Sequence, residues 1–390
     1  MKVETITHEN GEQLPLLLDE VGLPLATPNE FIMGRRFLST NTLVRNLREL
    51  VVFYRWLEQE QIDLWFRIQS AQGFTEAEVR GAMVETLRRE QESDRKVKKI
   101  TISPHTFNQR LTTLRQFLVW CYDVYINSLP MTDTRYERIR EQQARLTKWL
   151  DSSFINAPPE NTKKQKGLTD KEISFLESIL DPENPDVVGR NEAVRYRNYI
   201  ATMVMLYYGL RPGELLSLRV QDIEIGAISA LRVERRPADP NDKRRPRPQI
   251  KRNGRVLPID NKLFANNLDQ YIMLWREKLE ANAEESEYLI LSDEGEPLSQ
   301  SALTQFYQGL RKRFPKKLPS HLTAKALRHT FSSRMEKLLR EYGLDEERRK
   351  QALAILRGDS GLQSQNVYIA QAIEENAKLA LKNFHNGLLR

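Results

Sequence analysis

Two segments in the first third of the chain share one pattern of apolar residues, and this pattern restricts them to helix. Equivalent residues lie 64 positions apart, as Ser39 and Ser103 do. In both segments apolar residues recur at steps of four and three, which places them in one stripe along a helix. The stripe comprises Leu43, Leu47, Leu50, Tyr54 and Leu57 in the first segment and Phe107, Leu111, Leu114, Leu118 and Cys121 in the second. The pattern predicts two amphipathic helices of a small helical bundle, since two copies are too few for a solenoid.

The boundaries of these helices are also predicted by residue type. Ser103 is followed by Pro104, the arrangement of an N-cap with proline at the first helical position, and Ser39 or Asn41 is the expected cap of the earlier helix. Four arginines lie on the polar faces and are candidate phosphate contacts: Arg45, Arg48, Arg110 and Arg115. The alternative is that they are ordinary exposed arginines.

The length of 390 residues exceeds the usual size of one domain, so two folded units are expected. Between Leu150 and Leu168 the apolar rhythm stops and the sequence becomes polar, with Pro158 and Pro159. We therefore divide the chain into an N-terminal arm (1–26), a helical first domain (27–150), a linker (151–167) and a second domain (168–390). Thr169 begins that domain as the expected cap of another helix.

One exception to the helical patterns of the second domain is a pair of short extended segments. Leu231 and Val233 alternate with polar residues within 228–235, and 255–259 forms a similar short run. We predict that the two segments pair as an antiparallel hairpin. Their long connection contains four prolines and is not expected to be regular structure.

Positive charge collects in two runs, which favours a polyanionic partner over a neutral one. The net charge is +7 and the isoelectric point is near 9.3. The runs contain Lys96, Lys98 and Lys99 in the first domain and Lys243, Arg244, Arg245 and Arg247 in the hairpin connection. A solvated loop is the alternative for either run alone, but together they favour nucleic acid.

Several classes of protein are excluded by composition. The mean hydropathy is −0.58, and no apolar run approaches the ~18 residues that cross a bilayer, so we expect no membrane association. Cys121 is the single cysteine, which excludes an internal disulfide and a cysteine-based zinc site and fits a reducing cytoplasm. The five histidines show no metal-ligand spacing.

A helical stripe ends at Gly209, and Pro212 begins another helix. Arg211 lies at this junction, beside amide groups that are able to hold an anion. The alternative is a surface arginine in a tight turn.

Three motifs in order resemble the boxes of the tyrosine recombinase (phage integrase) family. The segment 208–219, YGLRPGELLSLR, is similar to the first box; KALRHTF at 325–331 is similar to the His-x-x-Arg-His box; and LRGDS at 356–360 precedes Tyr368 by the interval that the family keeps before its tyrosine. Tyr368 lies nine residues after Asp359, the position of the family's histidine. The resemblance covers roughly Phe31 to Tyr368.

The resemblance implies an activity and its residues. Arg211 and Arg328 would bind the scissile phosphate, and Tyr368 would attack it to form a 3'-phosphotyrosyl intermediate. Lys251 would be the general acid that protonates the leaving oxygen, with Lys243 as the second choice. Paired arginine donors stabilise the phosphate charge without a metal ion, and the phosphotyrosine conserves the energy of the broken bond without ATP, so no cofactor is expected.

Two positions depart from the family pattern. Lys325 stands where most members have histidine, and Asp359 stands where they have histidine or tryptophan. Lys325 is expected to hold a phosphate oxygen. Asp359 would repel a phosphate unless a neighbouring cation compensates it, or it would orient Lys325 or accept a proton. These departures motivate an alternative function, a DNA-binding regulator or accessory factor with an impaired catalytic site. A helix-turn-helix repressor would not need arginine boxes spaced along the second half.

The resemblance also implies a fold and an assembly. We expect a mainly α protein with a helical SAM-like core-binding domain and a mostly helical catalytic domain that carries a small antiparallel sheet. The expected partner is a specific double-stranded DNA site, bound by a homo-tetramer on two sites and by a monomer or weak oligomer without DNA. We also expect His329 to contact DNA and the protein to act in the bacterial cytoplasm at the nucleoid. The tail from Ala370 is expected either to dock into a neighbouring subunit or to pack on its own domain.

Overall fold

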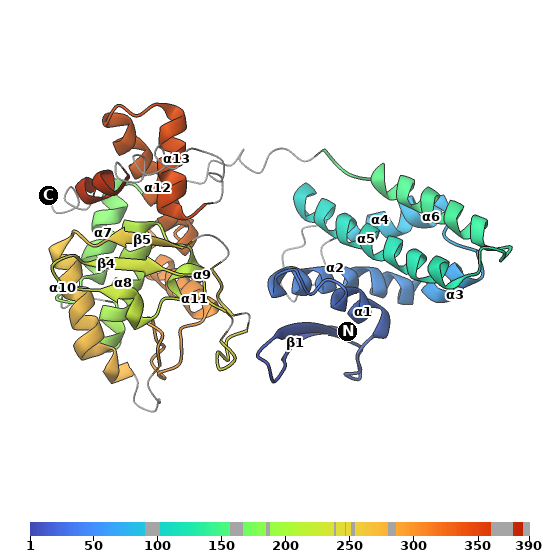
Figure 1. Ribbon diagram of the computed structural model, residues 1–390, viewed down its shortest axis with the longest axis horizontal. Helices are drawn as coiled ribbons and strands as arrows, with labels where there is room; N and C mark the ends of the chain where they lie inside the picture. The colour runs from blue at the N-terminus through green and yellow to red at the C-terminus, as the bar shows by residue number, and fades with distance from the viewer. Residues whose placement is uncertain are drawn as a thin grey trace. The chain divides into compact units, whose positions relative to one another are not determined.

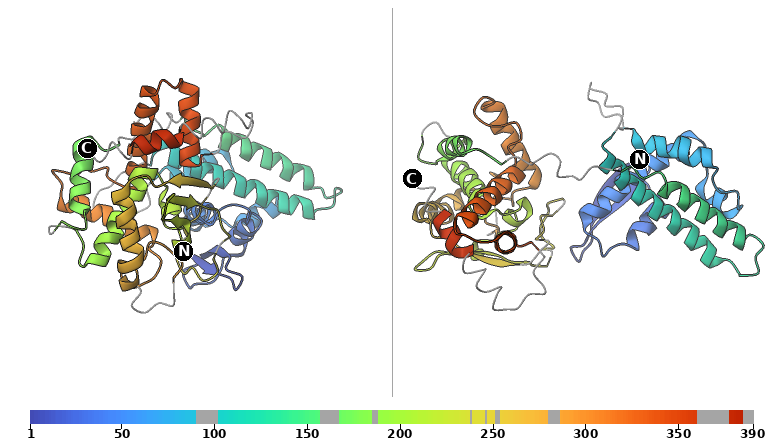
Figure 2. Two further views of the ribbon diagram at one scale, coloured as in Figure 1. Left: turned by 60° about the vertical axis from the view of Figure 1, so that its left-hand side comes forward. Right: turned by 90° about the horizontal axis from the view of Figure 1, so that it is seen from above.

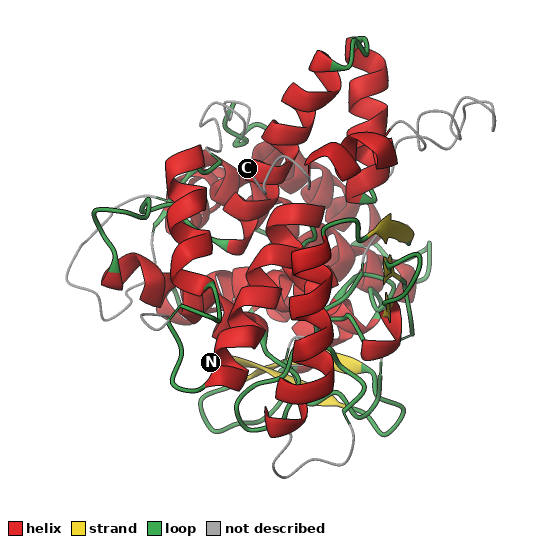
Figure 3. Cartoon of the chain, turned by 90° about the vertical axis from the view of Figure 1, so that its left-hand side faces the viewer, coloured by secondary structure: helices red, strands yellow, loops and turns green. Residues whose placement is uncertain are grey.

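The computed structural model describes residues 1–89, 102–156, 167–184, 188–237, 239–245, 247–250, 254–279, 286–359 and 377–384. The chain separates into two compact units, Met1–Lys163 and Lys164–Arg390. Helices predominate in both, and the strands are few and short (Figure 3). A mainly helical fold with small antiparallel sheets is thus confirmed. No helix in the described ranges has the length and apolar character needed to span a membrane.

The first unit combines a hairpin with a helical bundle (Figure 1). Its elements are β1 (Lys2–Thr7), β2 (Gln13–Leu18), α1 (Ala26–Met33), α2 (Thr40–Gln59), α3 (Leu64–Gln69), the π-helical turn η1 (Ala77–Met83), α4 (Val84–Arg88), α5 (Pro104–Ser128) and α6 (Tyr136–Asp151). The expected arm is therefore mostly hairpin: β1 and β2 pair antiparallel, from Lys2 opposite Leu18 to Thr7 opposite Gln13. Leu17 is fully buried in the core of the bundle and so attaches the hairpin to it.

The two helices predicted from the repeated pattern are α2 and α5, and both predictions are confirmed. Ser39 and Ser103 are the N-caps, and their hydroxyls accept hydrogen bonds from the amides of Thr42 (3.4 Å) and Thr106 (3.2 Å). The apolar stripes of the two helices face each other in one core, where Leu47 and Leu111 are completely buried. This placement follows from the spacing, because apolar side chains on one helical face are stable only when covered.

A buried polar contact fixes how α2 and α5 are matched. Asn46 donates to the hydroxyl of Thr113 at 2.6 Å, and that hydroxyl donates to Glu49 at 2.6 Å. All three side chains are buried. Because an unpaired buried polar group costs free energy, this arrangement favours one register of the two helices over others.

The second unit is built around α8, which packs against α12 (Figures 1 and 2). Its helices are α7 (Asp170–Leu180), α8 (Glu192–Tyr208), α9 (Pro212–Leu215), the 3-10 turn η3 (Val220–Asp222), α10 (Lys262–Gln270), the π-helical turn η4 (Tyr271–Trp275), the 3-10 turn η5 (Glu277–Leu279), α11 (Gln300–Arg313), α12 (Ala324–Glu341) and α13 (Glu346–Arg357). Its strands are β3 (Ile223–Glu224), β4 (Ala230–Val233) and β5 (Arg255–Pro258). Residues 192–208 are mostly buried because α8 is covered on several sides.

The predicted hairpin is confirmed, and a third short strand extends it. Strands β4 and β5 pair antiparallel with Val233 opposite Arg255, and β3 joins the other side of β4. Gly254 is required before β5, because a Cβ atom there would lie 2.8 Å from the carbonyl oxygen of Val233. The hairpin thereby positions Arg255 at the start of β5, next to α9.

Helical residues 377–384 pack on their own unit. Ala377, Ala380 and Leu381 are buried in its core, and the ring of Phe384 lies edge-on to that of Phe331, with 5.9 Å between centroids. Of the two alternatives for the tail, the structure supports packing on its own domain for these residues. Ala370, at which the predicted tail begins, lies outside the described residues.

Candidate active site

Arg211 is positioned by the sharp change of direction between α8 and α9. Gly209 ends α8 in the left-handed conformation, with φ 63°. A side chain at Gly209 would also collide with the ring of Phe331, so glycine is required for two separate reasons. Pro212 then begins α9, whose first turn leaves the guanidinium of Arg211 about one third exposed (30%).

Arg328 reaches the same place from α12. Its side chain is only 8% exposed, and Nη1 donates to the carbonyl of Gly209 at 2.5 Å. Both arginines also donate to the carbonyl of Arg357 at the end of α13, Arg211 at 3.3 Å and Arg328 at 3.2 Å. The two motif arginines, 117 positions apart in the sequence, therefore converge.

Glu214 holds Arg211 and Arg328 in place through its buried carboxylate. Its carboxylate, 1% exposed, accepts from the amide of Arg211 at 3.0 Å and from its Nη1 at 2.7 Å. It also accepts from Nη2 of Arg255 at 2.9 Å and lies 3.8 Å from Nη1 of Arg328. One buried carboxylate thus fixes three guanidinium groups, whose planar forks suit such shared recognition.

Asp359 approaches the two motif arginines from the more open side. Gly358 ends α13 in the left-handed conformation, with φ 62°, and turns the chain back so that the amide of Asp359 donates to Ala354 at 2.8 Å. Its Oδ1 pairs with Nη2 of Arg211 and lies 3.2 Å from Nη2 of Arg328. Its Oδ2 lies 3.1 Å from Nε of Arg357.

Positive charge exceeds negative charge in this cluster. Four guanidinium groups, those of Arg211, Arg255, Arg328 and Arg357, share the two carboxylates of Glu214 and Asp359. Burial, with Arg211 and Arg357 nearby, lowers the pKa of Arg328 to about 9, so this arginine stays charged at neutral pH. An excess of fixed cations around a partly open position is an arrangement that attracts an anion.

Of the two positions that depart from the family pattern, Lys325 lies on α12 and Asp359 follows the end of α13. Lys325 is exposed, one turn before Arg328. His329 is half-buried, and burial followed by Lys325, Arg357 and Arg328 lowers its pKa, which favours the neutral ring at neutral pH. Asp359 pairs with Arg211 and Arg328, so neighbouring cations compensate its charge.

Several predicted residues lie outside the described residues. They are Tyr368, Lys251, Lys96, Lys98 and Lys99. Their roles stay predictions.

The basic run in the hairpin connection divides into buried and exposed members. Arg244 pairs with Asp242 at 2.9 Å and donates to the carbonyl of Leu216 at 2.8 Å. Arg247 donates to the carbonyl of Asp242 at 2.6 Å. Both arginines are buried, so they hold the connection against the domain, and their contact with DNA stays a prediction. Lys243, which pairs with Glu296 at 3.2 Å, and Arg245 are exposed.

The arginines of the first unit differ in a similar way. Arg48 is exposed on α2, and Arg45 pairs with Glu49 at 3.6 Å. Arg110 instead donates to the carbonyls of Leu87 and Arg89, both at 2.9 Å, and Arg115 pairs with Asp151 at 2.5 Å. Arg110 therefore stabilises the end of α4, and contact of these four arginines with phosphate stays a prediction.

Three members of the cluster were not identified from the sequence: Glu214, Arg255 and Arg357. Glu214 and Arg357 lie within the quoted motifs, so their position was a usable signal. Nothing in the sequence pointed to Arg255, because a charged residue at the end of a strand is ordinarily exposed. Its side chain is 6% exposed, and its Nε and Nη1 have no hydrogen-bond partner in the described part of the chain.

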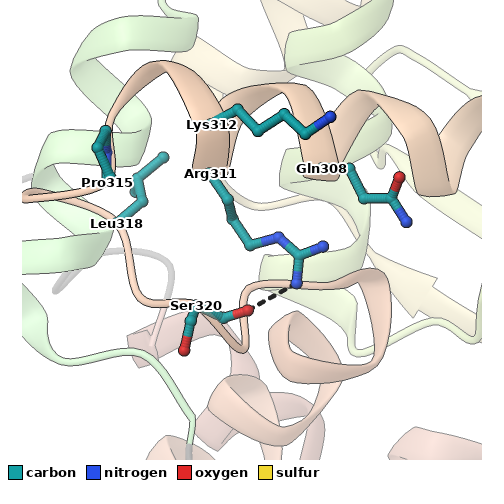
Figure 4. A pocket seen from close by; sticks show the side chains of 6 residues that line it. All are labelled: Gln308, Arg311, Lys312, Pro315, Leu318 and Ser320. Atoms are coloured by element: carbon teal, nitrogen blue, oxygen red, sulfur yellow. Dashed lines mark hydrogen bonds between the residues drawn. The ribbon is translucent and has the colours of Figure 1, made fainter. Parts of the chain in front are cut away.

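A separate cavity of about 300 Å³ lies at the end of α11 and contains none of these residues. It is lined by Gln308, Arg311, Lys312, Pro315, Leu318 and Ser320 (Figure 4). Arg311 donates to the carbonyl of Ser320 at 2.6 Å, which closes the loop after α11. Among the described residues, no group of side chains suited to a metal ion is found.

Comparison with known proteins gives one family match. Residues 176–338, which include Arg211, Glu214, Arg255 and Arg328, match the model of the phage integrase family. No curated protein matches the chain.

Several solved structures resemble the chain at low identity. The Tn1549 transposon integrase in complex with transposon right end DNA is 18% identical, with a TM-score of 0.48, 90% of this chain and 97% of that chain covered. The XerH site-specific recombinase bound to its difH substrate before cleavage is 13% identical, with a TM-score of 0.45 and coverages of 90% and 83%. A lambda integrase dimer bound to a core site is 15% identical, with a TM-score of 0.36 and coverages of 95% and 93%.

Proposed function

Because residues 176–338 form a domain of the phage integrase family, we propose that this chain is a site-specific DNA recombinase or integrase that cuts and rejoins DNA strands. The observation that carries the proposal is the convergence of Arg211 and Arg328 on one anion, the Oδ1 atom of Asp359. At the position of that oxygen, two guanidinium groups bind the same anionic oxygen. A phosphate oxygen of the DNA backbone has the same charge and hydrogen-bonding capacity.

The proposed reaction exchanges one phosphodiester for another. The Tyr368 hydroxyl gives its proton to water and attacks the phosphorus, the bond to the 5'-oxygen breaks, and Lys251 gives that oxygen its proton. The product is a 3'-phosphotyrosine and a free 5'-hydroxyl. A 5'-hydroxyl of a second strand reverses these steps and joins the new ends. The reaction as proposed needs neither ATP nor a metal ion, because the phosphotyrosine retains the bond energy and the arginines neutralise the developing charge.

Each remaining member of the cluster has a role in this proposal. Glu214 keeps Arg211, Arg255 and Arg328 in place before DNA arrives, so their arrangement costs no reorganisation during the reaction. Lys325, exposed one turn before Arg328, contacts a further phosphate oxygen. His329, neutral at neutral pH, donates or accepts a hydrogen bond at the same phosphate.

The partner in this proposal is double-stranded DNA with a specific site. Its backbone is contacted by exposed residues that include Arg45, Arg48, Lys243 and Arg245, together with Arg115, Lys96, Lys98 and Lys99. Four copies assemble on two sites, while the free protein is a monomer or weak oligomer. The reaction takes place in the bacterial cytoplasm at the nucleoid.

A recombination assay in cells tests the proposed function. The repeats that flank the gene are cloned as two candidate sites on one plasmid, and product formation is measured by amplification across the new junction. We expect Arg211→Ala and Arg328→Ala each to reduce recombination by ~10²- to 10³-fold, the loss typical of removing one preorganised hydrogen-bond donor to a developing oxyanion. Arg334→Ala is the matched control, since Arg334 also lies on α12 but pairs with the exposed Asp170. Full recombination by the Arg211 and Arg328 variants would contradict the proposal.

A second candidate function is a DNA-binding regulator that keeps the fold but does not cleave. The pairing of Asp359 with both motif arginines favours it, because this carboxylate opposes a phosphate at the same position. Tight DNA binding without cleavage by the wild type, and still without cleavage after Lys325→His and Asp359→His are combined, would select this function. Cleavage by the wild type would exclude it.

A further inference from the structure

We propose that Asp359 is a specificity-determining residue: its carboxylate occupies the anion position between Arg211 and Arg328, and a phosphate must displace it to bind. This inference rests on the proposed function, since it assigns the same position to the DNA phosphate. Free phosphate ions compete poorly with the resident carboxylate. A phosphodiester within bound duplex competes well, because the rest of the DNA contributes binding free energy.

The contacts of Asp359 are those of a bound anion. Oδ1 pairs with Nη2 of Arg211 and lies 3.2 Å from Nη2 of Arg328, so one oxygen is shared by two guanidinium groups. Oδ2 lies 3.1 Å from Nε of Arg357. Charge-assisted contacts of this kind are what a phosphate oxygen would make with the same donors.

The two carboxylates of the cluster differ in accessibility. Glu214 is 1% exposed and bonded to the backbone amide of Arg211 as well as to side chains. Asp359 is 30% exposed, as is Arg211, so solvent and ligands reach the contact between them. Glu214 is therefore the structural counter-ion, and Asp359 is the one that an incoming anion is able to replace.

Removal of Asp359 leaves the arginines supported. Arg211 keeps its bond to Glu214 at 2.7 Å, and Arg328 keeps its bond to the carbonyl of Gly209 at 2.5 Å. The amide of Asp359 bonds to Ala354 through the backbone, which a change of side chain does not remove. A variant without the carboxylate should thus retain two oriented guanidinium groups whose charge is no longer compensated.

The consequence is conditional binding of phosphate. In the wild type an anion contacts the two arginines only after Asp359 has lost its own contacts with them. The net free energy of binding a lone phosphate ion is therefore small. When the duplex is bound through other contacts, the scissile phosphate is held at a high local concentration and displaces the carboxylate. The active position is then filled only on bound DNA.

Binding of inorganic phosphate to the full chain tests this inference directly. Affinity is measured by isothermal titration calorimetry at low ionic strength, with circular dichroism to verify folding. We expect Asp359→Asn to bind phosphate about tenfold more tightly than the wild type or better, the scale of one charge-assisted contact. Asp359→Glu, which keeps the charge, should resemble the wild type.

Two controls locate the effect. Asp170→Asn removes the same charge from an exposed pair with Arg334 and should leave phosphate affinity unchanged. In Asp359→Asn, the added substitution Arg211→Ala should abolish the gain. An Asp359→Asn chain that is unfolded, or folded with no gain in affinity, would overturn the inference, as would a gain that survives the loss of Arg211. The assay involves no strand cleavage, so a failed recombination assay with a positive phosphate result would reject only the proposed function.

Discussion

At the scale of single residues, Glu214 is the group on which the candidate site depends most. Burial raises the pKa of Glu214, but Arg255 and Arg211 outweigh burial and hold this pKa below its usual value. The carboxylate is therefore ionised at neutral pH and compensates three nearby guanidinium groups. Without it those cations would repel one another in a place with little water to screen them.

Glu214→Gln is expected to lower the free energy of unfolding by about 3–5 kcal/mol, because it leaves buried charges uncompensated. Urea denaturation measures this, and Glu224→Gln, in an exposed pair with Arg232, should cost ~1 kcal/mol at most. Because the folded pKa of Glu214 is lowered, its contribution is present above the unfolded pKa and is lost as the pH falls through the folded value. The difference from wild type should therefore shrink in acid. Equal costs for the two variants would contradict this role.

Gly209→Ala should destabilise the protein by about 2 kcal/mol or more, because a Cβ atom there meets the Phe331 ring and the left-handed φ of 63° disfavours it. Gly226→Ala is the matched control, since nothing lies within 4 Å of the added atom. Thermal unfolding of both variants distinguishes them. Equal melting temperatures for the two variants would contradict the close approach of α8 and α12 at Gly209.

At the level of helices and strands, features set by neighbouring residues were predicted from the sequence, whereas contacts between distant residues were not. The capped helices α2 and α5, the capping box at Thr169 and the β4–β5 hairpin each depend on neighbouring residues, so their spacing was sufficient. Arg211 and Arg328 were found as a pair only through family resemblance. The contact of Asp359 with Arg211, 148 residues earlier, has no local signal.

The burial of charged side chains was the other feature that could not be predicted from the sequence. The run that contains Arg244 and Arg247 has the composition of a polyanion-binding loop, yet both arginines are buried by bonds to carbonyl groups and to Asp242. Composition gives the charge of a segment but not its neighbours. For the same reason the burial of Arg255 was not predicted, since its partner Glu214 lies on a different element.

Helical residues 377–384 provide a prediction at this scale. Leu381 is fully buried and Leu379 is 52% exposed in the same short helical segment. We expect Leu381→Ala to cost about 2–5 kcal/mol of unfolding free energy, whereas Leu379→Ala should stay within about 0.5 kcal/mol of wild type. Chemical denaturation monitored by circular dichroism measures both. A tail that packs elsewhere would make the two substitutions equivalent.

At the scale of the whole molecule, the chain consists of two units with separate hydrophobic cores and a net charge of +7. Each unit carries exposed basic residues, among them Arg48 in the first and Lys325 in the second. Cations in both units suit a ligand with charge repeated along its length.

DNA binding by the full chain should consequently depend steeply on salt. If six or more phosphates are contacted, affinity for duplex should fall by ~10³-fold between 50 and 200 mM salt. Arg48→Ala should reduce the slope of log affinity against log salt by about one. Fluorescence anisotropy over a salt series provides the data. Affinity that does not change with salt would contradict a binding mode based on phosphate contacts.

Attack by Tyr368 on a phosphate held by Arg211 and Arg328 is tested by trapping the covalent intermediate. The full chain is incubated with duplex that carries its end sequence and a nick beside the cleavage position, and the products are separated under denaturing conditions. We expect a protease-sensitive protein–DNA adduct that Tyr368→Phe abolishes while its DNA affinity is retained. An adduct that persists in Tyr368→Phe, or no adduct from wild-type protein on a site that it binds, would rule out attack by Tyr368.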